Sequence, residues 1–233
     1  MRNADRRNLA FWFVALVAVL ALKQLYGMAE LPQLQWLLQP LVLLLEAVSD
    51  LSFLPLASGA WLDTQHDLII VKACAGGNFL LASWLGYLWR FGDAMSPARR
   101  VLLACAAAWL TTLGANALRI LLIAQSEDAL AAKLGLSGAD SHRLIGIAVY
   151  FCCLCLQMAS RGALLPGLLA AGALYLGVTL LLPALRAGLL GLPQIDVQHA
   201  LWIVGSTLTL ALATLLLASL WRGLRQFVSG RTT

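Results

Sequence analysis

Long apolar runs alternate with short polar segments along this chain. About 20 mostly apolar residues in a helix cross the hydrocarbon core of a bilayer. Helices suit this solvent because they satisfy their own backbone hydrogen bonds. The pattern therefore predicts an all-α polytopic membrane protein with about six transmembrane helices. The predicted spans, the second of them short, are Leu9–Tyr26, Gly77–Phe91, Val101–Ala124, His142–Ser160, Leu164–Leu185 and Ala200–Trp221.

Two segments between the first and second spans do not fit this scheme. The stretch 34–57 is apolar but contains Pro40, Glu46 and Asp50, and lone carboxylates are costly at the centre of a bilayer. We interpret it as one interfacial or re-entrant helix; a seventh span is the alternative. The more polar segment Trp61–Lys72 has β character and predicts a short β-hairpin on the outer face.

Composition supports lipid as the solvent for most of the chain. Of the 233 residues, 61% are hydrophobic and 12% are charged, whereas soluble proteins carry roughly 25% charged residues. No long polar block is present to form a second domain, so we expect one integral-membrane domain over residues 1–233. Arginines stand singly or in pairs between apolar runs, a pattern that disfavours a nucleic-acid partner.

The basic residues predict the orientation, because Lys and Arg in short loops favour the cytoplasm. This rule places the N-terminus, the loop before the third span and the C-terminus inside. Cys74, Arg119 and His142 then lie at the outer face. We expect the first run to be a retained helix, because no small-x-small cleavage pattern follows it. The basic residues that predict this orientation are Arg2, Arg6, Arg7, Arg90, Arg99, Arg100, Arg161, Arg222, Arg225 and Arg231.

Cys74 differs from the other cysteines in its polar, glycine-containing surroundings. It lies just before a predicted helix, whose N-terminus would favour a thiolate. Gly76 and Gly77 would let a substrate backbone approach closely, although simple packing of Cys74 is the alternative. The remaining cysteines lie in apolar runs, where we expect them to pack: Cys105, Cys152, Cys153 and Cys155.

Two further residues lie at the same predicted depth. Arg119 is about 27 Å along a helix from Val101, close to the core thickness of about 30 Å. It could stabilise an oxyanion or bind a carboxylate, or it could reach the outer headgroups. Asn116 is one turn earlier and could orient either partner. His142 could act as general base and then general acid; His66 is its rival.

These motifs resemble those of the exosortase/archaeosortase family. The matching segments are Cys-Ala-Gly-Gly-Asn-Phe at 74–79, Asn-x-x-Arg-Ile at 116–120 and His-x-x-x-Gly at 142–146. Their order and spacing match, and the short Gly-Asn form in a compact chain resembles the exosortase K branch. The resemblance covers about 61–150. The specific signal is the three motifs in this order, since each alone is weak and Asn-x-x-Arg is common.

The resemblance implies a multi-pass cysteine protease or transpeptidase of the inner membrane. Such an enzyme would cleave a C-terminal sorting signal of exported proteins at the periplasmic face, without metal or cofactor. Cys74 would be the nucleophile, Arg119 the transition-state stabiliser and His142 the proton shuttle. Family members often carry Ser where this chain has Ala75, so backbone N–H groups or Asn78 would contribute more.

Two other classes of function fit the same residues. A small transporter or channel subunit would use Arg119 and Asn116 to line a pathway, but no inverted repeat is evident. A non-catalytic assembly scaffold would use Cys74 for packing alone. Serine, zinc and aspartate intramembrane proteases fit poorly, because their sequence motifs are missing.

Overall fold

The computed structural model describes residues 3–66, 68–92, 95–135, 137–158, 164–191 and 197–229. The chain divides into two compact units, residues 1–142 and 143–233. The first unit contains all of the predicted site residues. Its elements are α1 (Asn3–Met28), η1 (Leu31–Leu34), α2 (Gln35–Val48), β1 (Leu54–Pro55), β2 (Trp61–Asp63), β3 (Leu68–Ile70), η2 (Lys72–Ala75), α3 (Gly77–Phe91), α4 (Pro97–Leu134) and the start of α5 (Gly138–Met158).

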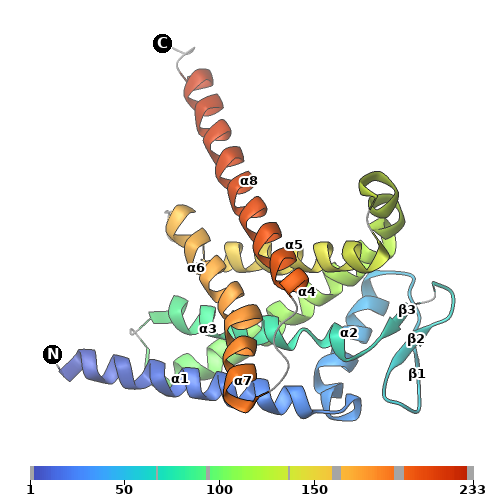
Figure 1. The fold of residues 1–233 in the computed structure, drawn as a ribbon, viewed down its shortest axis with the longest axis horizontal. Coiled ribbons are helices and arrows are strands. Elements are labelled where there is room, and N and C mark those ends of the chain that lie inside the picture. Colours follow the sequence, from blue (N-terminus) through green and yellow to red (C-terminus); the bar gives the residue numbers. More distant parts are fainter. Residues whose placement is uncertain are drawn as a thin grey trace. The chain divides into compact units, whose positions relative to one another are not determined.

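Helices α1, α3 and α4 run side by side in the first unit (Figure 1). Helices α3 and α4 form an antiparallel hairpin, in which the Tyr87 hydroxyl lies 2.8 Å from Thr111 Oγ1. At the end where α4 begins, Arg100 Nε donates to the Leu88 carbonyl at 2.7 Å. The Arg100 guanidinium also lies over the rings of Phe11 and Trp12 in α1. The starts of α1 and α4 therefore share one end of the unit, as the charge pattern predicts.

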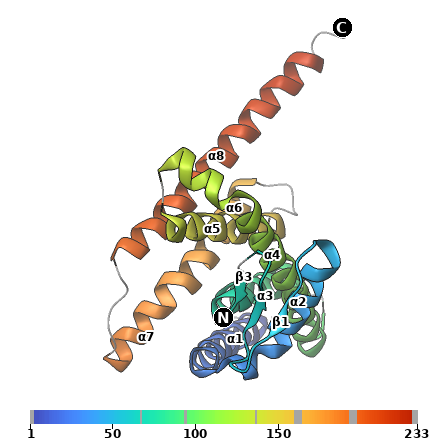
Figure 2. The same cartoon turned by 90° about the vertical axis from the view of Figure 1, so that its right-hand side faces the viewer.

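Helix α2 packs its apolar face against α4. Its buried residues recur every three or four positions, the spacing of one helix face. Leu113, Ala117 and Ile120 of α4 belong to the same core, as do Phe53, which precedes β1, and Ile70 of β3. In Figures 1 and 2, α2 runs across the direction of α1, with the sheet on its outer side. The contributing α2 residues are Leu37, Leu38, Leu41, Val42 and Leu45.

The predicted hairpin is confirmed and has one additional strand. Strands β2 and β3 pair antiparallel, with Trp61 opposite Ile70 and Asp63 opposite Leu68. Strand β1 pairs with β2, giving the order β1-β2-β3. Because β1 falls within 34–57, the interpretation of that stretch as one helix is wrong over its last third. The helix ends at Val48, since Ser49 is extended and its hydroxyl bonds to the Leu45 carbonyl.

Among the described residues, six helices are long and apolar enough to cross a membrane, which confirms the fold class. The set nevertheless differs from the predicted one. It includes Leu31–Val48 and leaves out α3, which has only 15 residues. The interfacial placement of Leu31–Val48 stays a prediction, and its course across α1 favours that placement. The six are Asn8–Met28, Leu31–Val48, Pro97–Ser126, Gly138–Met158, Leu164–Gly188 and Val197–Trp221.

The segment from Gln125 to Ser141, which separates the third and fourth predicted spans, is largely helical. Helix α4 continues to Leu134, because this segment is rich in Ala, Leu, Glu and Lys and lacks Gly and Pro until Gly135. Gly135 then ends the helix in the left-handed conformation, with φ of 64°. Arg119 consequently lies inside α4, about 33 Å from the start of that helix, and not at its end.

The second unit is helical throughout its described residues. Helix α6 (Leu164–Leu176) continues through a π-helical turn (Gly177–Leu181) into α7 (Leu182–Leu190), so the predicted span Leu164–Leu185 extends further. Helix α8 (Val197–Ser229) likewise exceeds its predicted bounds. Phe151 of α5 packs edge-on against Tyr175 of α6. The predicted cytoplasmic residues Arg161 and Arg231 lie outside the described residues.

Candidate active site

Cys74 lies on a single short turn between the sheet and α3. The turn is η2, which begins after extended Val71 and ends at Gly76. The Cys74 N–H donates to the Val71 carbonyl at 2.8 Å. Gly76 adopts the left-handed conformation, with φ of 67°, and α3 begins at the next residue. As expected, the thiol is placed just before a helix N-terminus, and it is half-buried.

Ala75 points its side chain into the apolar core. It is fully buried in the cluster formed by α2, α4 and the sheet. A serine hydroxyl at this position would therefore lie among leucine side chains and would need a buried partner. Alanine at position 75 thus fits the local packing.

Asn116 lies directly behind the glycine that shapes the turn. A Cβ atom on Gly76 would come within 2.6 Å of Asn116 Nδ2 and 2.7 Å of Asn116 Oδ1. Asn116 is only 1% exposed, so α4 closes tightly against the turn at this point. The structure therefore brings together two residues that the sequence analysis selected from separate motifs.

Arg119 is three residues further along α4 and reaches the thiol. Its Nη2 lies 4.0 Å from Cys74 Sγ, and the two residues are 45 positions apart in sequence. The Arg119 side chain is half-buried. A guanidinium at this distance is placed to stabilise negative charge that develops at the reacting atoms.

Tyr26 completes this group and was missed by the sequence analysis. Its hydroxyl donates to the Lys72 carbonyl, two residues before Cys74, at 2.9 Å. The ring lies against Gly77, where an added Cβ would come within 2.6 Å of ring carbons. Its position at the end of the first apolar run was the available signal, since tyrosines gather at membrane interfaces.

His142 lies in the first turns of α5 and is exposed. That helix begins with a reciprocal cap, in which the Asp140 N–H donates to Ser137 Oγ and the Ser137 hydroxyl donates to Asp140 Oδ2. Capping of this kind fixes where the helix starts and hence where His142 lies along it. The approach of His142 to Cys74 stays a prediction.

The other polar candidates have structural partners. Asn78 is exposed, and its Oδ1 accepts a hydrogen bond from Lys23 Nζ at 3.0 Å. His66, the rival base, lies at the hairpin with Nδ1 3.2 Å from Asp63 Oδ1 and Nε2 3.9 Å from Asp50 Oδ2. Across the described ranges, no group of three or more His, Cys, Asp or Glu side chains is placed to hold a metal ion.

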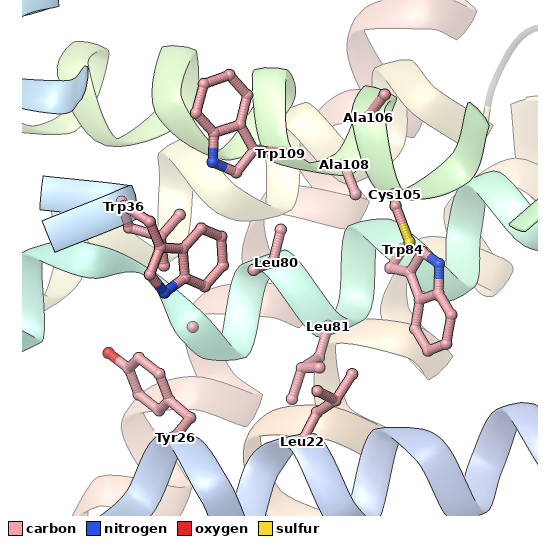
Figure 3. Close-up of a pocket in the computed structure, with 12 residues that line it drawn as sticks. Leu22, Tyr26, Trp36, Leu80, Leu81, Trp84, Cys105, Ala106, Ala108 and Trp109 are labelled. Atoms are coloured by element: carbon pink, nitrogen blue, oxygen red, sulfur yellow. The ribbon is translucent and has the colours of Figure 1, made fainter. Parts of the chain in front are cut away.

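An apolar cavity of about 460 Å³ adjoins the Cys74 turn. Figure 3 shows Leu22 and Tyr26 of α1 facing Leu80 and Leu81 of α3 across it. Tyr26 and Gly77 form its boundary toward the turn. The cavity lies among the helices of the first unit.

The chain matches no protein-family model, no curated protein and no solved structure.

Proposed function

We propose that this multi-pass membrane protein is a cysteine endopeptidase or transpeptidase of the exosortase type. It would cleave a C-terminal sorting signal of exported proteins at the outer face of the inner membrane. The observation that carries the proposal is the approach of Arg119 Nη2 to Cys74 Sγ at 4.0 Å. An arginine inside a predicted span is expensive and usually serves a partner or a cavity, and here it faces a potential nucleophile.

Acylation begins when His142 accepts the proton of the Cys74 thiol. The thiolate attacks the carbonyl carbon of the scissile peptide bond, and a tetrahedral oxyanion forms. His142 then donates the proton to the leaving amine as the C–N bond breaks. The products of this half-reaction are a thioester on Cys74 and a free amine on the released segment.

Arg119 has a larger share of oxyanion stabilisation here than in many cysteine proteases. Those enzymes commonly use backbone N–H donors for this purpose. In this chain the Cys74 N–H is already bonded to the Val71 carbonyl, so it is engaged within the turn. The guanidinium of Arg119 is the donor that lies beside the thiol, at 4.0 Å.

Deacylation reverses the same proton path. Water or an acceptor amine attacks the thioester, and His142 takes the proton of the attacking group. Collapse of the second tetrahedral intermediate returns the proton to the Cys74 sulfur. Water gives a free carboxylate on the exported protein, whereas an amine gives a new amide bond.

The test compares processing in a deletion strain that carries variants of this chain. Top-down mass spectrometry of membrane-anchored exported proteins measures whether their C-terminal segments are removed. We expect Cys74→Ala, Arg119→Ala and His142→Ala to accumulate unprocessed forms. Cys153→Ala and His66→Ala are matched controls and should process normally.

The outcomes separate the residue roles. Normal processing in all three site variants would reject the catalytic assignment. Loss in His66→Ala with normal processing in His142→Ala would transfer the role of base to the hairpin. A mass adduct on Cys74, trapped with a slowly deacylating substrate, would be direct support for the thioester.

A further inference from the structure

The turn that carries Cys74 has little internal support. It is a four-residue 3-10 helix, and such short helices are poorly stabilised by their own hydrogen bonds. Residues on either side of it, Val71 and Gly76, have extended and left-handed backbones. The position of the thiol therefore depends on contacts from outside the turn.

One phenol reaches both ends of this turn. The Tyr26 hydroxyl donates to the Lys72 carbonyl, two residues before Cys74, at 2.9 Å. The Tyr26 ring packs against Gly77, three residues after Cys74, where an added Cβ would come within 2.6 Å of ring carbons. A phenylalanine would fill the same space against Gly77 but would lose the hydrogen bond to the Lys72 carbonyl.

Lys72 makes the reciprocal connection to α1. Its Nζ donates to the carbonyls of Gly27 at 2.9 Å and Ala29 at 2.6 Å. The last carbonyls of a helix have no partner within it, and a cation there also suits the helix dipole. The ammonium lies 5.5 Å from the centre of the Tyr26 ring, within range of a cation–π interaction.

We propose that Tyr26 and Lys72 form a clasp between α1 and the Cys74 turn, and that Tyr26 is a positioning residue for the thiol. The clasp fixes the register of the turn against α4, so that Cys74 meets Arg119. Its effect on processing rests on the proposed function, whereas its effect on the thiol does not.

The experiment measures alkylation of Cys74 in the full chain, with the other four cysteines replaced by alanine. Iodoacetamide is the probe, and the protein is held in detergent micelles. Tyr26→Phe is compared with Tyr87→Phe, which loses a hydroxyl that bonds to Thr111, away from the turn. Each change is made with and without Arg119→Ala, giving a double-mutant cycle.

We expect Arg119→Ala to change the alkylation rate strongly in the parent and in Tyr87→Phe. In Tyr26→Phe the effect of Arg119→Ala should shrink by about tenfold, as expected when a hydrogen bond that positions the turn is lost. Lys72→Met should behave like Tyr26→Phe. An unchanged Arg119 effect in both Tyr26→Phe and Lys72→Met would overturn the clasp.

Processing gives a second, separable readout. Tyr26→Phe should lower kcat by about tenfold with a smaller change in KM, because the nucleophile and not the substrate is misplaced. If the parent chain processes no substrate, the proposed function fails while the alkylation cycle still decides the clasp. Equal kcat in Tyr26→Phe and Tyr87→Phe would contradict a role in positioning.

Discussion

Gly76 controls how closely α4 approaches the Cys74 turn. Its positive φ is a conformation that side-chain-bearing residues rarely adopt. Its missing Cβ leaves space for the buried amide of Asn116. These two requirements fall on one residue, so a small substitution there should move the thiol relative to Arg119.

The first prediction therefore concerns Gly76→Ala. We expect loss of about 1–3 kcal/mol from the clash with Asn116, as in other overpacked cores, beyond about 1–2 kcal/mol of backbone strain. Processing should fall at least about tenfold, because such strain shifts the nucleophile. Thermal midpoints in detergent and the processing assay are the measurements.

Gly92→Ala is the matched control for this substitution. Gly92 also has positive φ, 61°, but an added Cβ there meets no atom of the described residues within 4 Å. It should show the strain without the clash and should leave processing unchanged. Equal effects of the two substitutions would mean that the contact between Gly76 and Asn116 is unimportant.

At the residue scale, the sequence motifs predict which candidate catalytic residues lie together. They do not predict which other residues hold these in place. Cys74, Asn116 and Arg119 stand in recognisable patterns, and the structure places them together. Tyr26 and Lys72 are joined by a hydrogen bond across 46 positions. Neither lies in a motif, so only the packing of α1 against α3 reveals that they meet.

Among the elements, the three-stranded sheet is organised around the buried carboxylate of Asp63. Asp63 is fully buried, and it accepts hydrogen bonds from the N–H groups of Ser52, Gln65 and His66. Burial raises the pKa of the Asp63 carboxyl, but these backbone donors and the His66 ring outweigh it, so the net pKa lies below its usual value. The carboxylate is thus stabilised in its charged form by the fold itself.

The second prediction follows from this shift. The pKa of the Asp63 carboxyl is lower in the folded chain than in the unfolded chain, where it is about 3.9. The ionised carboxylate therefore adds to the free energy of unfolding above the unfolded pKa, and this contribution is lost as the pH falls through the folded pKa. The thermal midpoint of the parent should drop on acidification from pH 7 to pH 3. Asp63→Asn should begin about 2–4 kcal/mol less stable, from lost charge-assisted hydrogen bonds, and should lack this component.

The exposed neighbour Asp50 provides the control. Its side chain is 89% exposed, so Asp50→Asn should retain both the stability and the acid-dependent component of the parent. A parent and an Asp63→Asn variant with identical pH profiles would contradict the assignment of the acid sensitivity to Asp63.

The third prediction concerns the opposite end of the first unit, where Arg100 joins α1, α3 and α4. Arg100 is 5% exposed and combines a hydrogen bond to Leu88 with two aromatic contacts. Arg100→Ala should cost about 2–4 kcal/mol, because a buried charge-assisted bond and cation–π contacts are lost. Arg99→Ala, at an exposed position, should change the thermal midpoint little; equal losses would refute the packing role.

Element boundaries depart from the sequence prediction where hydropathy and helix propensity differ. Hydropathy indicates where contact with lipid ends, and on that basis the third span was predicted to end at Ala124. Propensity governs where the helix ends, and α4 therefore reaches Leu134. The reverse applies to 34–57, which remains apolar although its helix ends at Val48. There the Glu46 carboxylate accepts the Phe53 N–H, a contact that local pattern does not reveal.

For the whole molecule, the first unit has two chemically different ends. One holds Arg100 with the start of α1; the other holds the Cys74 turn with the end of α1. The charge rule places the first end in the cytoplasm. Lys23 and Lys72 lie at the second end, against that rule, but both bond to the protein: Lys23 to Asn78 and Lys72 to the end of α1. Basic residues with such partners are poor indicators of topology.

The last prediction tests this orientation directly. A membrane-impermeant maleimide applied to intact cells or right-side-out vesicles should label Cys74 in a chain whose other cysteines are alanine. Ser96→Cys, made with Cys74→Ala in that background, sits at an exposed position between α3 and α4 and should label only after permeabilisation.

The two sites flank α3, so opposite accessibility would also establish that this 15-residue helix crosses the membrane. At about 22 Å it is shorter than the core of about 30 Å, so crossing requires local thinning of the bilayer or flanking residues at depth. Labelling of both sites from the same side would show that α3 returns without crossing, and the proposed periplasmic active site would fail with it if that side were the cytoplasm.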